Sequence, residues 1–218
     1  MADLRAVELW RYPVKSLRGE RLERAYFDRD AIRGDRRLRV EDDRGLVTAR
    51  TRPGLLRVAA TVGADGEPLI DGEQWRSAGA DRAVSRMAPG GRLVSTEGAE
   101  VGLRFDLAPI LILTTSLVSE LGVDFRRLRP NVLIDGAEGR EEAEWVGRTI
   151  ELGSAVLRVT GRCERCVMTT FDPDTIEQDP NVLRRINSQF GRVFGLHCDV
   201  EVPGVVERDA AVIVESRA

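Results

Sequence analysis

Hydrophobic and polar residues alternate over short stretches in the first ninety positions, which is the pattern of half-buried β-strands. Strands are therefore predicted at residues 4–12, 22–27, 38–40, 46–48 and 56–62. Polar turn sequences follow the third and fifth of these strands, DDRG at 42–45 and ADGE at 64–67. A turn-rich segment at residues 78–91 is a candidate seam between two halves of the chain.

The second half of the chain mixes strand and helix patterns. Further strands are predicted by apolar or alternating runs at residues 109–113, 131–134, 155–159, 194–202 and 210–214. A short helix is expected at residues 116–121, where Gly122 ends it. The clearest helix begins at residues 179–180, with Pro180 in its first position and Gly191 at its end. Its apolar face consists of Val182, Leu183, Ile186 and Phe190.

Many short strands with two or three helices are typical of a predominantly β, α+β protein with barrel character. The chain has 218 residues, 42% of them hydrophobic and 32% charged, as in an ordinary globular protein. A net charge of −3 gives no general attraction to nucleic acid. The longest apolar run, residues 108–113, is far shorter than the roughly 20 residues that cross a membrane, and no targeting pattern opens the sequence. These features predict a cytoplasmic protein.

One residue stands out in the composition. Lys15 is the only lysine among 33 basic residues, and all the others are arginines. A compact ammonium on a flexible stem differs from a planar guanidinium, so Lys15 is a candidate for a role that arginine cannot take. Chance survival of one lysine is the alternative.

The segment around Cys163 and Cys166 carries the most chemical information. A zinc site would need two more ligands, and His197 and Cys198 are adjacent residues whose side chains diverge. A redox-active cysteine pair and two purely structural thiols are alternatives to zinc. Arginines at positions 162 and 165 bracket the cysteines and favour a thiolate, the form that binds soft metals and acts as a nucleophile.

Six ordered motifs of the chain resemble those of the MOSC domains, the group that includes the mitochondrial amidoxime reducing components and their bacterial counterparts. The motifs are YPVKSLRG at 12–19, GDR at 34–36, TARTRP at 48–53, DLAP at 106–109, RLRPN at 127–131 and CERCVMTTFDP at 163–173. The resemblance implies a barrel-like MOSC fold with a β-rich N-terminal region at 1–90 and a MOSC domain with the cysteine motif at 91–218. It also implies a molybdenum cofactor, molybdopterin, and at the level of the family only an association with pyridoxal phosphate binding.

The same resemblance implies roles for individual residues. Cys166, the second cysteine of its motif, matches the cysteine that binds molybdenum in the amidoxime-reducing branch, so it is the expected metal ligand and catalytic residue. Pterin and phosphate contacts are expected from Lys15, Ser16, Arg36, Arg129 and Asn131. Glu164 and Arg165 are expected beside the metal. Asp106, Thr115 and Ser116 complete the expected cofactor-binding set, with turn and helix-cap roles as the alternative.

The resemblance predicts an oxidoreductase that reduces N-hydroxylated compounds, small-molecule substrates that bind at the metal. No ferredoxin-type cysteine pattern follows, so electrons are expected from a separate electron-transfer protein. The alternative function is a carrier of sulfur or of the cofactor, with a persulfide on Cys166, and a zinc-stabilised structural module is a third class. Cys163 is expected to be a buried neighbour of the metal ligand, with a sulfur-relay thiol and a disulfide partner as alternatives. Cys198 is expected in the core of the strand at 194–202, and Trp10, Trp75 and Trp145 are expected as packing residues.

Overall fold

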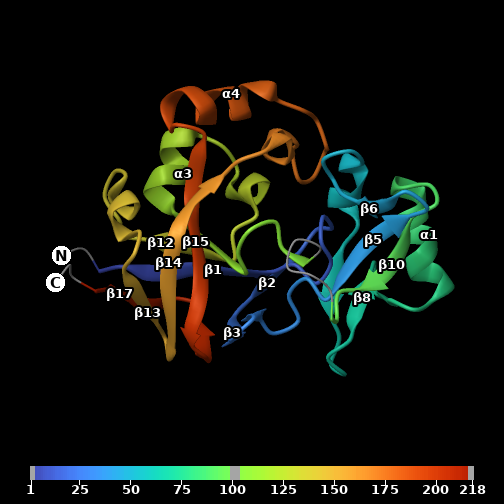
Figure 1. The fold of residues 1–218 in the computed structure, drawn as a ribbon, viewed down its shortest axis with the longest axis horizontal. Coiled ribbons are helices and arrows are strands. Elements are labelled where there is room, and N and C mark those ends of the chain that lie inside the picture. Colours follow the sequence, from blue (N-terminus) through green and yellow to red (C-terminus); the bar gives the residue numbers. More distant parts are fainter. Residues whose placement is uncertain (1–2, 99–103, 216–218) are drawn as a thin grey trace.

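The computed structural model describes residues 3–98 and 104–215. Its larger part is built from the strands β1 (Arg5–Arg11), β11 (Ile110–Thr114), β12 (Val132–Asp135), β13 (Thr149–Leu152), β14 (Ala155–Glu164), β15 (Val193–Val202) and β17 (Ala210–Val214). These strands follow one another in the order β12-β11-β15-β14-β13-β17-β1, and a further pairing of β12 with β1 closes the sheet into a barrel (Figure 1). The predicted predominantly β, barrel-like fold is thus confirmed.

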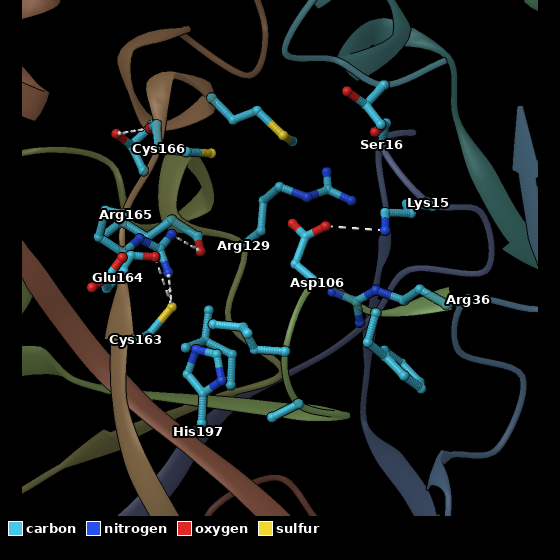
Figure 2. Close-up of a pocket in the computed structure, with 18 of the residues that line it drawn as sticks. Lys15, Ser16, Arg36, Asp106, Arg129, Cys163, Glu164, Arg165, Cys166 and His197 are labelled. Atoms are coloured by element: carbon cyan, nitrogen blue, oxygen red, sulfur yellow. Dashed lines mark hydrogen bonds and ion pairs between the residues drawn. The ribbon is translucent and has the colours of Figure 1, made fainter. Parts of the chain in front are cut away.

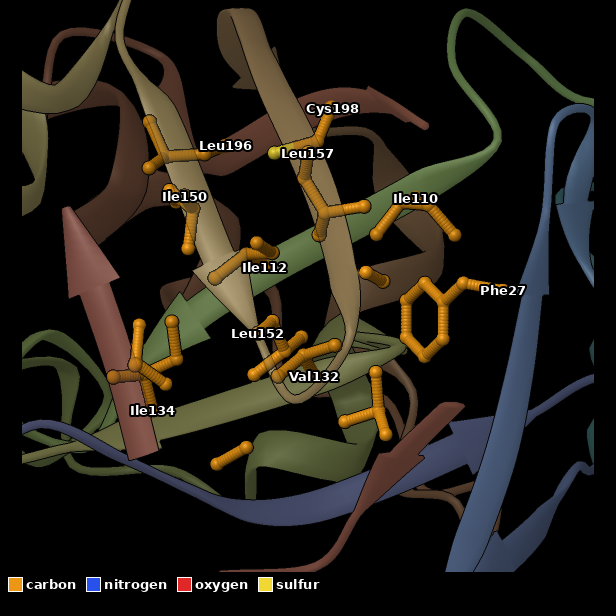
Figure 3. Close-up of a cluster of buried hydrophobic side chains, with 14 of the residues drawn as sticks. Phe27, Ile110, Ile112, Val132, Ile134, Ile150, Leu152, Leu157, Leu196 and Cys198 are labelled. Carbon is orange, nitrogen blue, oxygen red and sulfur yellow. The ribbon is translucent and has the colours of Figure 1, made fainter. Parts of the chain in front are cut away.

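The barrel is filled by the inward-facing side chains of its strands. Along the first half of β14 buried and more exposed positions alternate, as a strand with one face inside a barrel requires. Ile112, Ile134, Leu157 and Leu196 come from four different strands and meet in the interior (Figure 3). Cys198 lies fully buried in the same core, where burial raises the pKa of its thiol.

Smaller sheets surround the barrel. Strand β2 (Glu20–Leu22) extends the barrel sheet beside β1. The remaining strands form three-stranded sheets: β3 (Arg24–Asp28), β4 (Ala31–Ile32) and β16 (Gly204–Glu207); β5 (Leu38–Asp42), β6 (Gly45–Val47) and β10 (Arg92–Ser95); β7 (Ala60–Val62), β8 (Pro68–Ile70) and β9 (Glu73–Gln74). The last two sheets lie with helix α1 (Ala78–Met87) beside the barrel and have their own apolar core (Figure 1).

Helices cover one end of the barrel. They are α3 (Thr115–Leu121) and α4 (Pro180–Gln189), accompanied by the short 3-10 helices η2 (Phe125–Leu128), η3 (Glu141–Trp145) and η4 (Val167–Thr170). Gly122 ends α3 in the left-handed conformation, as predicted. The Asp179 side chain accepts a hydrogen bond from the Asn181 amide at the start of α4, whose Val182 and Ile186 are buried. No helix in the described ranges is long and apolar enough to span a membrane.

Two local predictions are corrected by the structure. Residues 78–91, expected as a turn-rich seam, begin with helix α1, because Ser77 caps it and the small residues Ala80, Ala83 and Val84 pack against the second core. Residues 56–62, expected as one strand, contain the end of the 3-10 helix η1 (Pro53–Arg57) before β7 begins. The expected division at residue 90 stays a prediction; β1 lies within the barrel, and β10 pairs with β5 across that position.

The contact between β15 and β11 yields a stability prediction at Gly195. Its φ is +90°, and a Cβ there would come within 2.4 Å of the Leu113 side chain and 2.8 Å of the Ile112 carbonyl. Gly195→Ala should therefore lower the free energy of unfolding by roughly 2–4 kcal/mol, through backbone strain and overpacking. Gly161 on the paired strand has open space around its Cα, so Gly161→Ala is the matched control, with a change within about 1 kcal/mol. Urea denaturation of both variants measures the difference, and equal stabilities would contradict the packing.

Candidate functional site

A cavity of about 420 Å³ lies between the end of the barrel and the turns around residues 15–16, 36 and 48–50 (Figure 2). Its described polar and charged lining consists of Lys15, Ser16, Arg36, Thr48, Arg50, Arg104, Asp106, Arg127, Arg129, Cys163, Glu164, Arg165, Cys166, Thr169 and His197. Eight of the residues predicted for the site are in this set. Segments more than a hundred residues apart in sequence therefore supply one pocket, as is common for binding sites.

Backbone hydrogen bonds hold the first-half residues at the cavity. After β1, the Lys15 amide donates to the Leu38 carbonyl at 2.8 Å, and the Arg36 amide donates to the Tyr12 carbonyl at 2.8 Å. These two bonds join the segment that follows β1 to the segment that precedes β5. As a result, the ammonium of Lys15 and the guanidinium of Arg36 face the same space.

The backbone is strained at three lining positions. Ser16, Arg36 and Arg129 have φ values of +72°, +46° and +55°, in the left-handed region that non-glycine residues rarely adopt. Each such residue costs on the order of 1–3 kcal/mol and persists only where the surrounding structure enforces it. Strain of this kind concentrates at functional sites, so its presence in one cavity supports a binding role for these residues.

Asp106 organises the cations on one wall. Its carboxylate lies 3.0 Å from the Lys15 ammonium and 2.6 Å from the Arg50 guanidinium. Partial burial raises the pKa of Asp106, but the charges of Lys15, Arg50 and Arg36 lower it more, so the net direction is downward. Asp106 is therefore an anion that links two cations from the first half to the loop before β11.

Tyr12 and Asp35 position the guanidiniums of Arg36 and Arg129. Asp35 is fully buried, accepts a 2.6 Å hydrogen bond from the Tyr12 amide and pairs with Arg36. The guanidiniums of Arg36 and Arg129 lie 4.6 and 4.2 Å from the centre of the Tyr12 ring, within cation–π distance. Burial lowers the pKa of Arg129 to about 10.

Cys166 stands at the turn between β14 and η4. Its carbonyl accepts hydrogen bonds from the Thr169 amide at 3.1 Å and from the Thr169 hydroxyl at 2.9 Å, which fixes the backbone. The thiol is partly exposed and projects into the cavity (Figure 2). Arg50 lines the same cavity, and its interactions with Cys166 and Asp106 raise its pKa. The position suits a metal-binding or nucleophilic thiolate.

Cys163 has a different environment. It is buried, and its sulfur accepts a 3.1 Å hydrogen bond from the Arg165 guanidinium. Burial raises the pKa of this thiol, but Arg165 and His197 lower it more, so the net direction is downward. The structure thus places His197, a residue without a visible partner in the sequence, beside Cys163 in the cavity wall. Among the described residues no three His, Cys, Asp or Glu side chains are grouped to hold a metal ion by themselves.

Three residues predicted for the site lie outside its described lining. The Asn131 side chain is buried and joins two strands, because it accepts from the Leu111 amide at 3.1 Å and donates to the Trp10 carbonyl at 3.2 Å. The Thr115 hydroxyl donates to Asp135, and the Ser116 hydroxyl donates to Thr114 at 3.2 Å, at the start of α3. Their contacts are those of structural residues.

Sequence reasoning missed several lining residues. Arg50 lies in the TARTRP motif and Arg127 opens the RLRPN motif, and these motifs were the available signal for both arginines. The position of Arg104 in the cavity could not be predicted, because nothing in the sequence distinguishes it from the many other arginines of the chain. His197 was considered only as a possible zinc ligand beside the cysteine pair, and its place next to Cys163 in the cavity wall was not predicted. Only the folded arrangement brings these residues to the cavity.

Comparisons with known proteins agree with this fold and site. The sequence model described as the MOSC N-terminal beta barrel domain matches residues 3–88, and that of the MOSC domain matches residues 113–213. The chain is 24% identical to mitochondrial amidoxime-reducing component 1 of Mus musculus over 91% of this chain and 78% of that protein. With mitochondrial amidoxime reducing component 2 of Macaca fascicularis the identity is 24%, over 77% of this chain and 67% of that protein.

Other similarities are more local or more distant. The match to mitochondrial amidoxime reducing component 2 of Homo sapiens has 32% identity but spans 32% of this chain and 22% of that protein. The crystal structure of the YUAD protein from Bacillus subtilis superimposes with a TM-score of 0.54 and 18% identity, over 100% of both chains, which shows a shared fold. Because the two MOSC models together match most of the chain, it belongs to the MOSC domain family.

Proposed function

We propose that the cavity binds a molybdenum cofactor, with the Cys166 thiolate as the protein ligand of the metal, and that the protein reduces N-hydroxylated compounds. The observation that carries the proposal is the combination of one accessible thiol with a cluster of cations in a single cavity. A metal with soft character favours thiolate ligands, and a pterin with a phosphate tail needs cations.

The charges of the cavity fit an anionic ligand. Seven lysine and arginine side chains and two carboxylates are in the described lining. Asp106 and buried Asp35 neutralise part of this charge. The guanidinium of Arg129, by contrast, makes no hydrogen bond or ion pair with any residue in the described ranges and lies against the Tyr12 ring. A phosphate group could meet this unbalanced charge together with Lys15 and Arg36.

The sulfur chemistry of the cavity separates the two cysteines. Cys166 projects into the open space, whereas Cys163 is engaged by Arg165 in the wall. Arg50 lines the same cavity as Cys166, and its charge would attract an anionic cofactor to the thiol. The bound cofactor would supply the redox chemistry of the reaction.

Apolar residues suit an organic substrate. Phe105, Leu107, Ala108 and Met168 also line the cavity, and Leu107 is 68% exposed. They would contact the carbon skeleton of a substrate whose N-hydroxyl group points inward. Reduction breaks the N–O bond, consumes an electron pair and protons, and releases water; a separate electron-transfer protein supplies the electrons. The relatives named as amidoxime reducing components support this reaction class.

Substitution of the two cysteines tests the proposal. Cys166→Ser should lower the reduction of an N-hydroxylated test compound by about a hundredfold or more, because a hydroxyl is a harder donor than a thiolate. Cys163→Ser should retain activity within about threefold, since Cys163 is assigned no bond to the metal. The assay uses the molybdenum-loaded protein and an artificial electron donor.

Two results would contradict this assignment. Equal activities of the two serine variants would exclude Cys166 as the metal ligand. An inactive loaded wild type that gains a persulfide on Cys166 from a sulfur donor would favour a carrier function. Elemental analysis of each sample reports molybdenum content independently of activity.

Lys15 provides a second test. Lys15→Ala should lower cofactor retention about tenfold or more, because a charged hydrogen bond contributes about 1.5–3 kcal/mol to binding. Asp106 keeps its contact with Arg50 in this variant, so the fold should persist. Arg92→Ala is the matched control, since Arg92 is a surface cation paired with Asp43 at 3.3 Å outside the cavity lining. Molybdenum per protein after gel filtration measures retention; an unchanged value for Lys15→Ala would refute its role.

A further inference from the structure

A second cavity, of about 260 Å³, lies on the other side of Arg129 from the first. Arg127, Arg129 and Met168 line both cavities and so form the wall between them. The remaining lining of the second cavity is Trp10, Tyr12, Arg18, Gly19, Arg21, Leu56, Arg126, Phe171 and Pro173. None of these nine residues lines the proposed cofactor cavity.

Most of the cations in this second cavity are already neutralised. Arg21 donates two 2.7 Å hydrogen bonds to Glu8. Arg126 is bound by Asp124 and Asp174, each with a 2.6 Å contact. Arg127 donates to the Thr170 carbonyl at 2.9 Å and to Asp172 at 3.0 Å. Their charges are therefore not available to a ligand.

Two guanidiniums remain without a close carboxylate. Arg18 approaches Asp174 only to 3.9 Å. The Arg129 guanidinium makes no hydrogen bond or ion pair with any residue in the ranges 3–98 and 104–215, and it lies 4.2 Å from the centre of the Tyr12 ring. Because the Arg129 side chain is only partly exposed, its attraction for an anion would be screened less by water than that of a cation at an open surface.

The rest of the second cavity is apolar. Leu56 and Phe171 are 6% and 8% exposed, and Pro173 is buried beside them. The indole nitrogen of Trp10 donates to Glu8 at 3.0 Å. The Trp10 ring packs against Tyr12 and Phe125, with ring centres 6.4 and 6.0 Å apart, in keeping with the packing role expected for it, and it also lines the second cavity.

We propose that the second cavity is a binding site for a small aromatic carboxylate, whose carboxylate meets Arg129 and Arg18 while its ring packs against Trp10, Leu56 and Phe171. A planar guanidinium pairs with a carboxylate through two parallel hydrogen bonds. Aromatic side chains favour an aromatic partner over an aliphatic one. The second cavity is smaller than the first, at about 260 Å³ against about 420 Å³, and it shares Arg129 with the first, so a carboxylate here and a cofactor phosphate there would draw on the same guanidinium.

Phenylacetate is a suitable probe, and Trp10 is the reporter. Titration of the full chain with phenylacetate should change the tryptophan emission in a saturable way. Phenylacetamide, which lacks the charge, and acetate, which lacks the ring, should bind at least tenfold more weakly. Trp10→Phe should abolish the emission change, while calorimetry still detects phenylacetate binding.

Arginine variants locate the carboxylate. Arg129→Gln should weaken phenylacetate binding tenfold or more, and Arg18→Gln about threefold because this side chain is 45% exposed. Arg21→Gln is the matched control in the same cavity and should change binding less than twofold, since Glu8 already occupies its guanidinium. Lys15→Gln is the control for the first cavity and should leave binding unchanged. Circular dichroism verifies that each variant is folded.

Several outcomes would overturn the proposal. Equal binding of phenylacetate and phenylacetamide would show that no cation is used. A loss with Lys15→Gln as large as that with Arg129→Gln would place the probe in the first cavity. An emission change that persists in Trp10→Phe, or the absence of saturable binding, would exclude the second cavity as the site.

Discussion

The pairing of β1 with β12 on one side and β17 on the other is the constraint on which the rest of the structure depends. The pairing with β12 closes the barrel. At the end of β1 the Trp10 amide donates to the Asn131 carbonyl at 2.8 Å, which fixes where the chain leaves the barrel. The Asn131 side chain completes this connection with its bond to the Trp10 carbonyl. Lys15 then lies only a few residues beyond β1, and it lines the same cavity as Cys166, which stands in the turn after β14. The site therefore depends on a strand pairing between the two ends of the chain.

The first cavity concentrates positive charge, and three features of the protein reduce the repulsion among these cations. Asp106 bridges two of the cations on the exposed side, and Asp35 pairs with Arg36 in the interior. The Tyr12 ring contacts the guanidiniums that the carboxylates do not fully neutralise. The charge that remains is concentrated at Arg129, which faces both cavities. An anion in either cavity would alter the field in the other, since interactions in such partly buried surroundings are weakly screened.

The crowding of cations in the first cavity offers a reason why the single lysine of the chain stands at position 15. Lys15 is 8% exposed and reaches Asp106 in a space that Arg36 and Arg50 also approach. A compact ammonium fits among these guanidiniums, whereas another planar guanidinium would need more room and more acceptors. The rarity of lysine in the composition thus coincides with a crowded, charged position, although composition alone could not distinguish this from chance.

The sequence by itself determined the predominantly β fold, most strand positions, the helices that begin at residues 115 and 180 and the candidate thiol, because alternation, caps and motifs are local properties. It did not reveal α1, whose small buried residues resemble a turn until the second core covers them. Nor did it show that Asn131 joins strands, or that Arg50 and His197 reach the cavity. Those facts were decided by the tertiary structure, because strand register and loop packing bring distant residues together through contacts that no local pattern encodes.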